Sequence, residues 1–376
     1  MFANAIKLCT INGFTIRLDP SWLVIAALIF WSLSQQYFPD ALPDAPSNTY
    51  PIMAMVAMLC FFASLLAHEL AHSVVARRLG VPIKNITLFL FGGVAELEAE
   101  PQSAAVEFWV ALAGPAMSFA LAFGFWFLSV VAGAALEAES VIIVLSYLAL
   151  INLILAVFNL VPAFPLDGGR ILRAYLWHHR GDILSATRTA AKSGSVLGYV
   201  LMGFGILALF QGALATGIWQ IMIGGFVLIA ARSSYQSQLA RVAFDHKTVR
   251  DVMKCAPVTI SPDMNLSDYV NRTILAKCLN FVPVVDAGLL LGHMDRNLLS
   301  GIDRENWDST HVGDVFVGLD DLNSIDPDLP IQDVMTRISK TGRRKFMVVE
   351  DHNLVGVISL VDLIHYLQAS ERAIDL

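Results

Sequence analysis

Six long apolar stretches in the first 240 residues constrain this chain more than any other feature. Each is long enough, or nearly so, to cross the bilayer core, which takes about 20 apolar residues as a helix. Only 23 of these 240 residues are charged, whereas 34 of the remaining 136 are, close to the proportion of about 25% usual in soluble domains. We therefore predict a membrane domain over residues 1–240, followed by a water-soluble domain. The six predicted spans are residues 20–37, 52–79, 104–133, 141–161, 195–212 and 217–232.

The distribution of basic residues predicts how these spans are oriented. The loops after the first, third and fifth spans contain no Lys or Arg, whereas those after the second, fourth and sixth are basic. Basic loops tend to stay on the cytoplasmic side of a membrane. We therefore expect a multi-pass protein of the cell membrane, with both termini and the soluble domain in the cytoplasm.

Net charge and cysteine content argue against two further classes. The formal net charge is −7, so we expect no nucleic-acid partner. The four cysteines are scattered and form no C-x-x-C pair, which indicates neither a disulfide framework nor a cysteine zinc site.

The second predicted span contains the run His68-Glu69-Leu70-Ala71-His72. Residues four apart lie on one face of a helix, so both imidazoles can reach a single metal ion. Glu69 lies about 100° around the helix from His68, where it can act as a base toward a catalytic water. This H-E-x-x-H pattern is typical of hydrolytic zinc sites. The alternative is a polar cluster satisfied by neighbouring helices, although ionisable residues in a span usually indicate function.

A hydrolytic zinc ion takes three protein ligands and leaves a position for water. The third candidate is Asp167, in the segment Asn-Leu-Val-Pro-Ala-Phe-Pro-Leu-Asp-Gly-Gly that begins at Asn159. Its two prolines and glycine pair are expected to break the helix there. Broken backbone at membrane depth is tolerated where it lines a wet cavity or is buried in protein. The alternative is that Asp167 only caps the next helix.

The two motifs together resemble the site-2 protease family of intramembrane zinc metalloproteases, over most of the membrane domain. The resemblance implies that His68, His72 and Asp167 bind one zinc ion and that Glu69 is the general base. It also implies that Asn159 positions the substrate or stabilises the oxyanion. The implied substrate is a membrane-anchored protein, cut within or near its transmembrane segment.

Residues 83–98 are expected to form a short membrane-embedded β-hairpin that turns near Gly92-Gly93. Such a hairpin can hold an unwound substrate extended by β-augmentation, or it can be purely structural. Gly114-Pro115 in the third span resembles a further family element, with close helix packing as the alternative. Glu107, early in the same span, is expected to lie at the membrane interface.

The soluble half contains an internal repeat that resembles a tandem pair of CBS domains, with motifs over residues 245–316 and 317–370. The repeat pairs Val249–Met253 with Val312–Phe316 and Phe281–Asp286 with Phe346–Asp351.

The resemblance to CBS pairs implies a site for ATP or another adenine nucleotide, bound through a G-x-x-[ST]-x-x-D element. The second copy has this element as Gly356, Ser359 and Asp362, whereas the first has Asp295 and Leu298 at the last two positions. The acid suits ribose hydroxyls, and the serine with backbone amides suits phosphate. The alternative is a structural module without a ligand, or one that forms a homodimer.

The predicted fold is therefore a polytopic α-helical membrane protein with six transmembrane helices and a short hairpin, followed by a cytoplasmic α/β CBS-domain pair. The predicted function is intramembrane zinc proteolysis of membrane-anchored substrates, with nucleotide control through the CBS pair as a hypothesis. One alternative is a CBS-regulated transporter or channel, which leaves the coincidence of two zinc motifs unexplained. The other is a catalytically silent homologue that binds clients.

Overall fold

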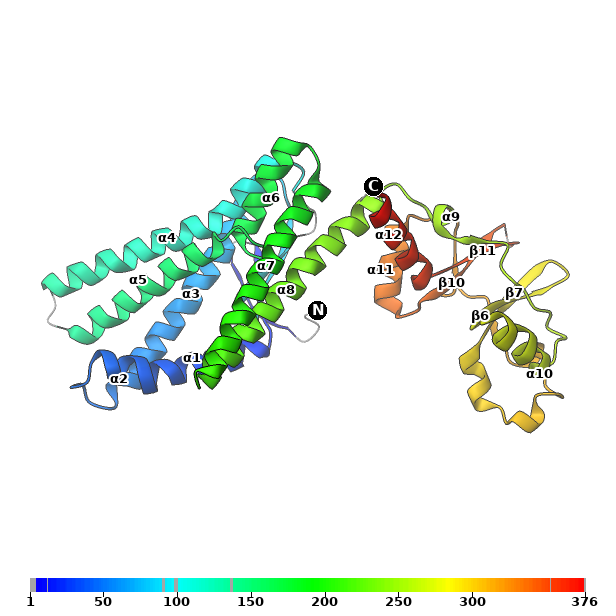
Figure 1. The fold of residues 1–376 in the computed structure, drawn as a ribbon, viewed down its shortest axis with the longest axis horizontal. Coiled ribbons are helices and arrows are strands. Elements are labelled where there is room, and N and C mark those ends of the chain that lie inside the picture. The colour runs from blue at the N-terminus through cyan, green and yellow to red at the C-terminus, as the bar shows by residue number, and fades with distance from the viewer. Residues whose placement is uncertain are drawn as a thin grey trace. The chain divides into compact units, whose positions relative to one another are not determined.

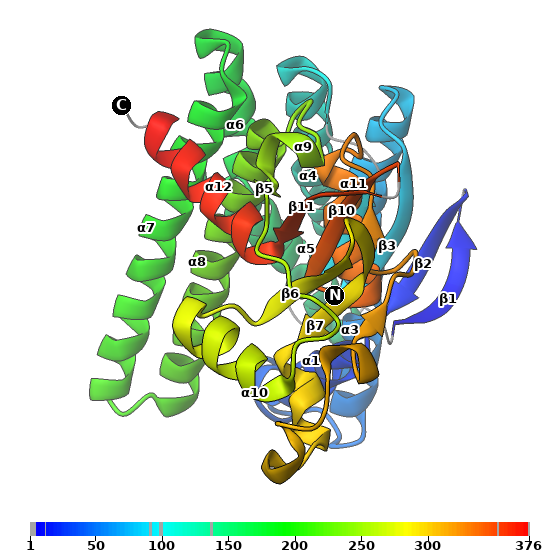
Figure 2. The same cartoon turned by 90° about the vertical axis from the view of Figure 1, so that its right-hand side faces the viewer.

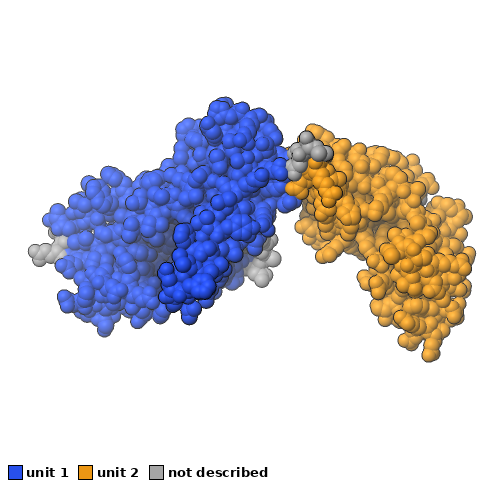
Figure 3. All heavy atoms as spheres, viewed as in Figure 1, with its two compact units in different colours: residues 1–236 blue, residues 237–376 orange. Residues whose placement is uncertain are grey.

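The computed structural model describes residues 5–11, 13–89, 92–97, 101–135, 138–351 and 353–374. The chain divides into two compact units, residues 1–236 and 237–376 (Figure 3). Each unit is described by itself.

The first unit consists mainly of helices (Figure 1). Within the described residues, five of them, α3, α4, α5, α7 and α8, are long and apolar enough to cross a membrane. Their exposed faces carry large apolar side chains such as Phe123, Phe210 and Ile229, which is the surface expected in contact with lipid. The helices are α1 (Ser21–Ser32), α2 (Phe38–Ala41), α3 (Thr49–Arg78), α4 (Ala104–Ala135), α5 (Glu139–Asn159), α6 (Asp167–Arg180), α7 (Ile183–Phe210) and α8 (Leu214–Ala243), the last of which crosses the division.

The first predicted span, residues 20–37, is not one continuous α-helix. The α-helix α1 has 12 residues and passes into the π-helical turn η1 (Leu33–Tyr37), which α2 then follows. The buried Ser34 hydroxyl bonds back to the carbonyl of Trp31 at 3.3 Å, and such side-chain bonds compete with the regular helical ladder. The sequence predicts six spans, whereas five helices in the described part of the chain have the length and apolarity of a span.

Glycines allow α7 and α8 to pack in close contact. A Cβ at Gly198 would lie 2.8 Å from the carbonyl oxygen of Gly224, and one at Gly224 would lie 2.6 Å from the carbonyl oxygen of Gly198. Gly205 and Gly217 form a second reciprocal pair along the same two helices. Small residues at such crossings let helix backbones approach within a membrane.

A four-stranded sheet accompanies the helices, in the order β1-β2-β3-β4. The predicted hairpin is present as β3 (Ile83–Phe89) and β4 (Gly92–Leu97), which pair antiparallel. It is not isolated, because β2 (Phe14–Leu18) pairs parallel with β3 and antiparallel with β1 (Ile6–Ile11) (Figure 2). Residues 90, 91 and 98 of the predicted hairpin lie outside the described residues, and its depth in a bilayer stays a prediction.

The sheet is attached to the end of α3. The guanidinium of Arg77, in the last turn of α3, lies 4.3 Å from the ring centroid of Phe14. Phe14, Ile16 and Ile86 are almost fully buried. The apolar face of β2 and β3 therefore packs into the protein.

The second unit contains two similar copies of a strand–helix arrangement. One sheet has the order β6-β7-β8 and the other β5-β11-β10-β9. The elements are α9 (Val249–Val252), β5 (Lys254–Cys255), α10 (Leu266–Tyr269), η2 (Val270–Leu275), β6 (Phe281–Asp286), β7 (Leu289–Asp295), η3 (Arg296–Gly301), η4 (Arg304–Asn306), η5 (Val312–Asp314), β8 (Val317–Gly318), β9 (Ser324–Ile325), α11 (Ile331–Thr341), β10 (Lys345–Glu350), β11 (Asn353–Ser359) and α12 (Leu360–Ile374).

The two hairpins share one register and one irregularity. In β6/β7, Val284 pairs with Gly292 and the register then shifts by a bulge. In β10/β11, Val348 pairs with Gly356 and the same shift follows. Equivalent residues of the two hairpins are therefore 64 positions apart.

This register corrects the alignment of one run in the repeat. The repeat as aligned from the sequence pairs Phe281 with Phe346, 65 positions later. In the structure, the residue equivalent to Phe281 is Lys345. Phe346 is fully buried, and its equivalent is the buried Val282. Both runs are apolar enough to match in either register, so side-chain type alone does not distinguish them.

The glycine contacts between α7 and α8 generate a prediction with a matched control in the neighbouring residue. The change Gly224→Ala places a methyl group against the Gly198 backbone, so we expect the free energy of unfolding to fall by about 1–3 kcal/mol. A Cβ at Gly225 meets nothing within 4 Å, so Gly225→Ala is expected to be neutral or slightly stabilising. Thermal unfolding of both variants in detergent checks this, and equal melting temperatures would contradict the close packing.

Candidate metal centre

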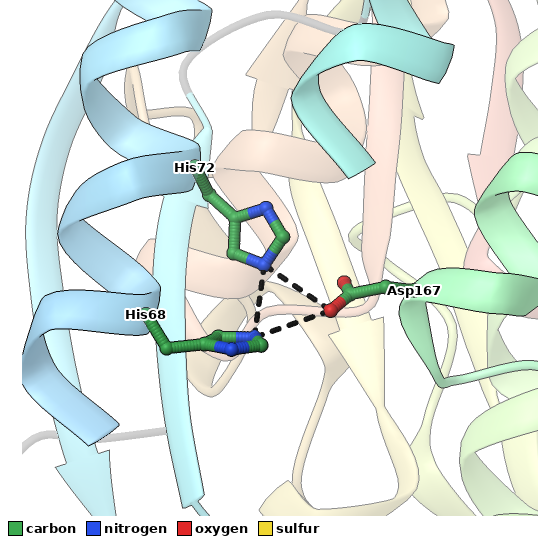
Figure 4. Close-up of side chains that lie close together, drawn as sticks. All are labelled: His68, His72 and Asp167. Carbon is green, nitrogen blue, oxygen red and sulfur yellow. Dashed lines mark hydrogen bonds and ion pairs between the residues drawn. The ribbon is translucent and has the colours of Figure 1, made fainter. Parts of the chain in front are cut away.

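Helix α3 places two histidines on one face, with their ring nitrogens converging. The Nε2 atoms of His68 and His72 are 3.1 Å apart, and both side chains are buried (Figure 4). The i, i+4 spacing on a regular helix is sufficient to bring them together.

The other nitrogen of each ring is held by α4. The Nδ1 atom of His72 donates to the carbonyl oxygen of Val110 at 2.7 Å, and Nδ1 of His68 lies 2.9 Å from the Ser118 hydroxyl. A carbonyl only accepts, so the proton of neutral His72 is assigned to Nδ1 and the lone pair to Nε2. Bonds of this kind orient metal-binding histidines and fix their tautomer.

Asp167 completes a three-residue cluster from a different helix. Its Oδ2 atom lies 3.2 Å from Nε2 of His68 and 3.2 Å from Nε2 of His72. Two ligand atoms on a tetrahedral zinc ion with bonds of about 2.0–2.1 Å are about 3.3 Å apart. The nitrogen and oxygen donors are also those that zinc accepts, so these three residues fit a zinc ion and leave a fourth position open.

The alternative role of Asp167 as a simple cap does not match the helix terminus. The N-cap of α6 is Leu166, and Asp167 is the first helical residue. Its carboxylate is directed at the histidines (Figure 4). The candidate third ligand therefore lies where a broken helix restarts.

The glycine pair after Asp167 lets α6 begin close to the preceding loop. A Cβ at Gly168 would overlap the carbonyl oxygens of Leu160 and Val161, and one at Gly169 would overlap the backbone of Ala163. Any larger residue would push α6, and Asp167 with it, away from this loop.

Gly114 of α4 lies directly opposite the two histidines. A Cβ built at this position would overlap Nε2 of both His68 and His72. The alternative for Gly114 is close packing between helices, but the atoms that a side chain here would overlap are the two nitrogens expected to bind the metal. The absence of a side chain leaves space at the metal centre.

The two other predicted site residues lie on α3 and at the end of α5. Glu69 follows His68 on α3, and Asn159 is the last residue of α5; both are half-buried. Their roles as general base and oxyanion or substrate contact stay predictions.

Known proteins resemble this chain over nearly all of its length. The model of peptidase family M50 matches residues 56–136 and 128–203, which include both motifs of the metal centre, and the CBS domain model matches residues 312–369. Rip3 of Mycobacterium tuberculosis, which bears a zinc metalloprotease name, is 35% identical over 96% of this chain and 92% of its own. Zinc metalloprotease MJ0392 of Methanocaldococcus jannaschii is 30% identical, over 84% of this chain and 86% of its own. The chain belongs to peptidase family M50.

Membership in family M50 confirms the predicted family, the fold class and the zinc metalloprotease function. It also favours the protease interpretation over the transporter or channel alternative. Among solved structures, the site-2 protease from Methanocaldococcus jannaschii aligns with 29% identity, a TM-score of 0.42, and coverage of 61% of this chain and 95% of that one.

Four residues around the M50 metal centre were not found as site residues from the sequence. Ser118 and Val110 hold the histidines, and Ser118 is detectable as a polar residue one turn after Gly114. Glu107 is 2% exposed and forms an ion pair with Arg173 of α6, and its expected position at the membrane interface stays a prediction. No sequence signal connects two residues 66 positions apart.

The second CBS copy of this M50 protein holds its predicted nucleotide residues together. Oδ2 of Asp362 accepts hydrogen bonds from the Ser359 backbone and hydroxyl at 2.9 and 2.6 Å. Its Oδ1 lies 2.8 Å from Nζ of Lys254. Burial opposes ionisation of Asp362, but the hydrogen bonds from Lys254 and Ser359 outweigh it and lower the pKa of the carboxyl group. A Cβ at Gly356 would overlap Met253, so this glycine lets β5 approach β11.

The position of Gly114 predicts that a single methyl group disables the metal centre. The change Gly114→Ala is expected to weaken zinc binding by more than tenfold, because the methyl group occupies space beside both Nε2 atoms. The matched control is Gly124→Ala on the same helix, where a Cβ meets nothing within 4 Å. Zinc content of the purified proteins measures both, and a full complement of zinc in Gly114→Ala would contradict this role.

Proposed function

We propose that His68, His72 and Asp167 hold the catalytic zinc ion of this M50 protease and that Glu69 is its general base. The observation that carries the proposal is the convergence of two Nε2 atoms and one Oδ2 atom at 3.1–3.2 Å from one another. The outer contacts of both histidines with α4 support it, because they leave the converging atoms available to a metal.

The chemistry assigns a separate task to each group. Zinc, when bound, supplies Lewis acidity and brings the pKa of its water toward neutrality. Glu69 accepts the proton of the attacking water and returns it to the amine that leaves. The Asn159 amide donates a hydrogen bond to the scissile carbonyl oxygen as negative charge develops there.

The substrate class follows from the location of this centre among apolar helices. Membrane proteins are the substrates implied for this family, and we propose cleavage within or near their transmembrane segments. A helix keeps its amides paired, so the substrate must unwind locally before attack. Strand β4 is at the edge of its sheet, which supports its role as a template for an extended substrate; a purely structural hairpin is the alternative.

Domain limits and orientation form part of the same proposal. Residues 1–240 form the protease domain, and residues 245–316 and 317–370 form the two CBS motifs. Both termini and the CBS pair lie in the cytoplasm of a cell-membrane protein, which the basic residues that end α3 support.

We further propose that the second CBS copy binds ATP or another adenine nucleotide through Gly356, Ser359 and Asp362, and that binding controls proteolysis. Asp362 is held by Lys254 and Ser359, so ribose hydroxyls must replace or share these bonds. A pair that forms a homodimer without a nucleotide is the alternative.

Removal of the proposed base separates catalysis from metal binding. The change Glu69→Gln is expected to leave about one zinc per chain and to lower cleavage of a single-span model substrate by about 10²–10⁴-fold. The control is Glu139→Gln, at an exposed position in the first turn of α5, which is expected to cleave like the wild type. Cleavage by Glu69→Gln at the wild-type rate would place the base elsewhere. If zinc-loaded wild type cuts no substrate, the client-binding alternative is favoured.

Nucleotide binding is tested by calorimetry with ATP on the full-length protein. We expect one site per chain, and about a ten- to hundredfold weaker affinity in Asp362→Ala, because hydrogen bonds to a charged group are lost. The control is Asp295→Asn in the first copy, which lacks the complete element and is expected to leave the affinity unchanged. Absence of binding to the wild type would refute nucleotide control.

A further inference from the structure

A buried ion pair connects α4 and α6 next to the metal centre. Nε of Arg173 donates to Oε1 of Glu107 at 2.6 Å, and Nη2 of Arg173 contacts the same oxygen. Glu107 and Arg173 are 2% and 8% exposed. Removing two charges from water is costly, and a buried pair is often replaceable by apolar residues without loss of stability. The presence of this pair inside an apolar helical unit therefore calls for a reason other than stability.

Glu107 lies on the face of α4 that lines the metal centre. Glu107, Val110, Gly114 and Ser118 are spaced by three or four residues, so they form one stripe along the helix. Three of them meet the histidines: Val110 through its carbonyl, Gly114 through its missing side chain and Ser118 through its hydroxyl. The fourth, Glu107, meets Arg173. One face of α4 therefore contacts every element that supplies a ligand.

Arg173 links this face to the segment that carries the third ligand. It lies on α6, the helix that begins at Asp167. Its guanidinium also lies 5.2 Å from the ring centroid of Phe164, in the loop that leads into α6. The same side chain therefore contacts the loop before Asp167 and the helix face that orients both histidines.

We propose that Glu107 and Arg173 are positioning residues that set the location of Asp167 relative to His68 and His72, and thereby the affinity for zinc. The histidines are aligned by direct bonds to α4, and the ion pair aligns α6 with the same face. This inference rests on the proposed ligand set. It assigns a role to two residues that neither bind the metal nor touch the reacting atoms.

The test measures the zinc dissociation constant of the detergent-purified full-length protein by competition with a chromophoric chelator. Glu107→Gln and Arg173→Met are each expected to weaken zinc binding by about 10–100-fold, the range found for residues that orient metal ligands. If the two residues act as a unit, the double variant binds zinc no more weakly than the worse single variant. The melting temperature of each zinc-free protein is measured in parallel.

A matched control separates positioning from general stability. Asn152 is a fully buried polar residue of α5 that donates to the Ser64 hydroxyl of α3 and to the Leu148 carbonyl of its own helix. Asn152→Leu is expected to change the melting temperature but to leave the zinc dissociation constant within about twofold of the wild type. A drop in zinc affinity that follows the melting temperature equally in all variants would overturn the positioning role.

Asp167→Ala distinguishes failure of this inference from failure of the proposed function. If Asp167→Ala binds zinc as tightly as the wild type, the ligand set is wrong, and the positioning role is overturned with it. If Asp167→Ala loses zinc while Glu107→Gln and Arg173→Met bind it like the wild type, only the positioning role is overturned. If Glu107→Gln and Arg173→Met do not fold, Glu107→Asp and Arg173→Lys replace them in the test. These two changes keep each charge but alter the length or shape of the side chain that carries it. An intermediate loss of zinc affinity in them supports the inference, and wild-type affinity refutes it.

Discussion

A polar group in the interior of a membrane protein has no bulk water to bond, so each one needs a partner supplied by the protein. The metal centre is built around this requirement. His68 and His72 each bond through Nδ1 to α4, which turns both Nε2 atoms toward Asp167. The directions of the two proposed histidine ligands are thus set by contacts within the protein.

Helix α4 carries much of this organisation, although it supplies none of the three proposed ligands. Its buried stripe offers a carbonyl, a hydroxyl, a carboxylate and, at Gly114, an empty space. A glycine within a helix costs about 1 kcal/mol relative to alanine. Alanine at position 114 would nevertheless place a methyl group in overlap with Nε2 of both histidines. The same logic applies to Gly168 and Gly169, which allow the helix of the third ligand to restart next to its own loop.

The parts of the site that depend on one local element were predictable from the sequence. The pairing of His68 with His72 is a property of helical spacing, and the break before Asp167 follows from prolines and glycines. That Asp167 reaches the histidines depends on how two distant helices pack. The sequence offered Asp167 as a candidate third ligand, and the resemblance to the site-2 proteases implied that all three residues share one zinc ion. The Val110 contact is made by a backbone carbonyl, which carries no residue identity. Glu107 is charged and near a helix start, so its burial depends on a partner that the sequence does not indicate.

The fold shows the same distinction between local and distant information. Five of the six predicted spans correspond to long helices, because apolar length is a local signal. The strands β1 and β2 were not predicted, although Asn12-Gly13 between two strand-forming runs is a strong hairpin signal. The 64-residue offset of the CBS hairpins depends on pairing partners, Val284 with Gly292 and Val348 with Gly356, which no single strand specifies.

Strand β5 has a consequence for how the two domains are joined. Helix α8 ends at Ala243, and at Lys254 the chain has already become an edge strand in the sheet of the second CBS copy, paired with β11. Only after this does it form the first copy. The polypeptide that leaves the membrane domain is therefore anchored first in the copy encoded last. A pull on this tether meets the backbone hydrogen bonds of residues 247–250 to residues 327–331 and then the β5–β11 bonds before it reaches the first copy, so the two copies are not mechanically independent.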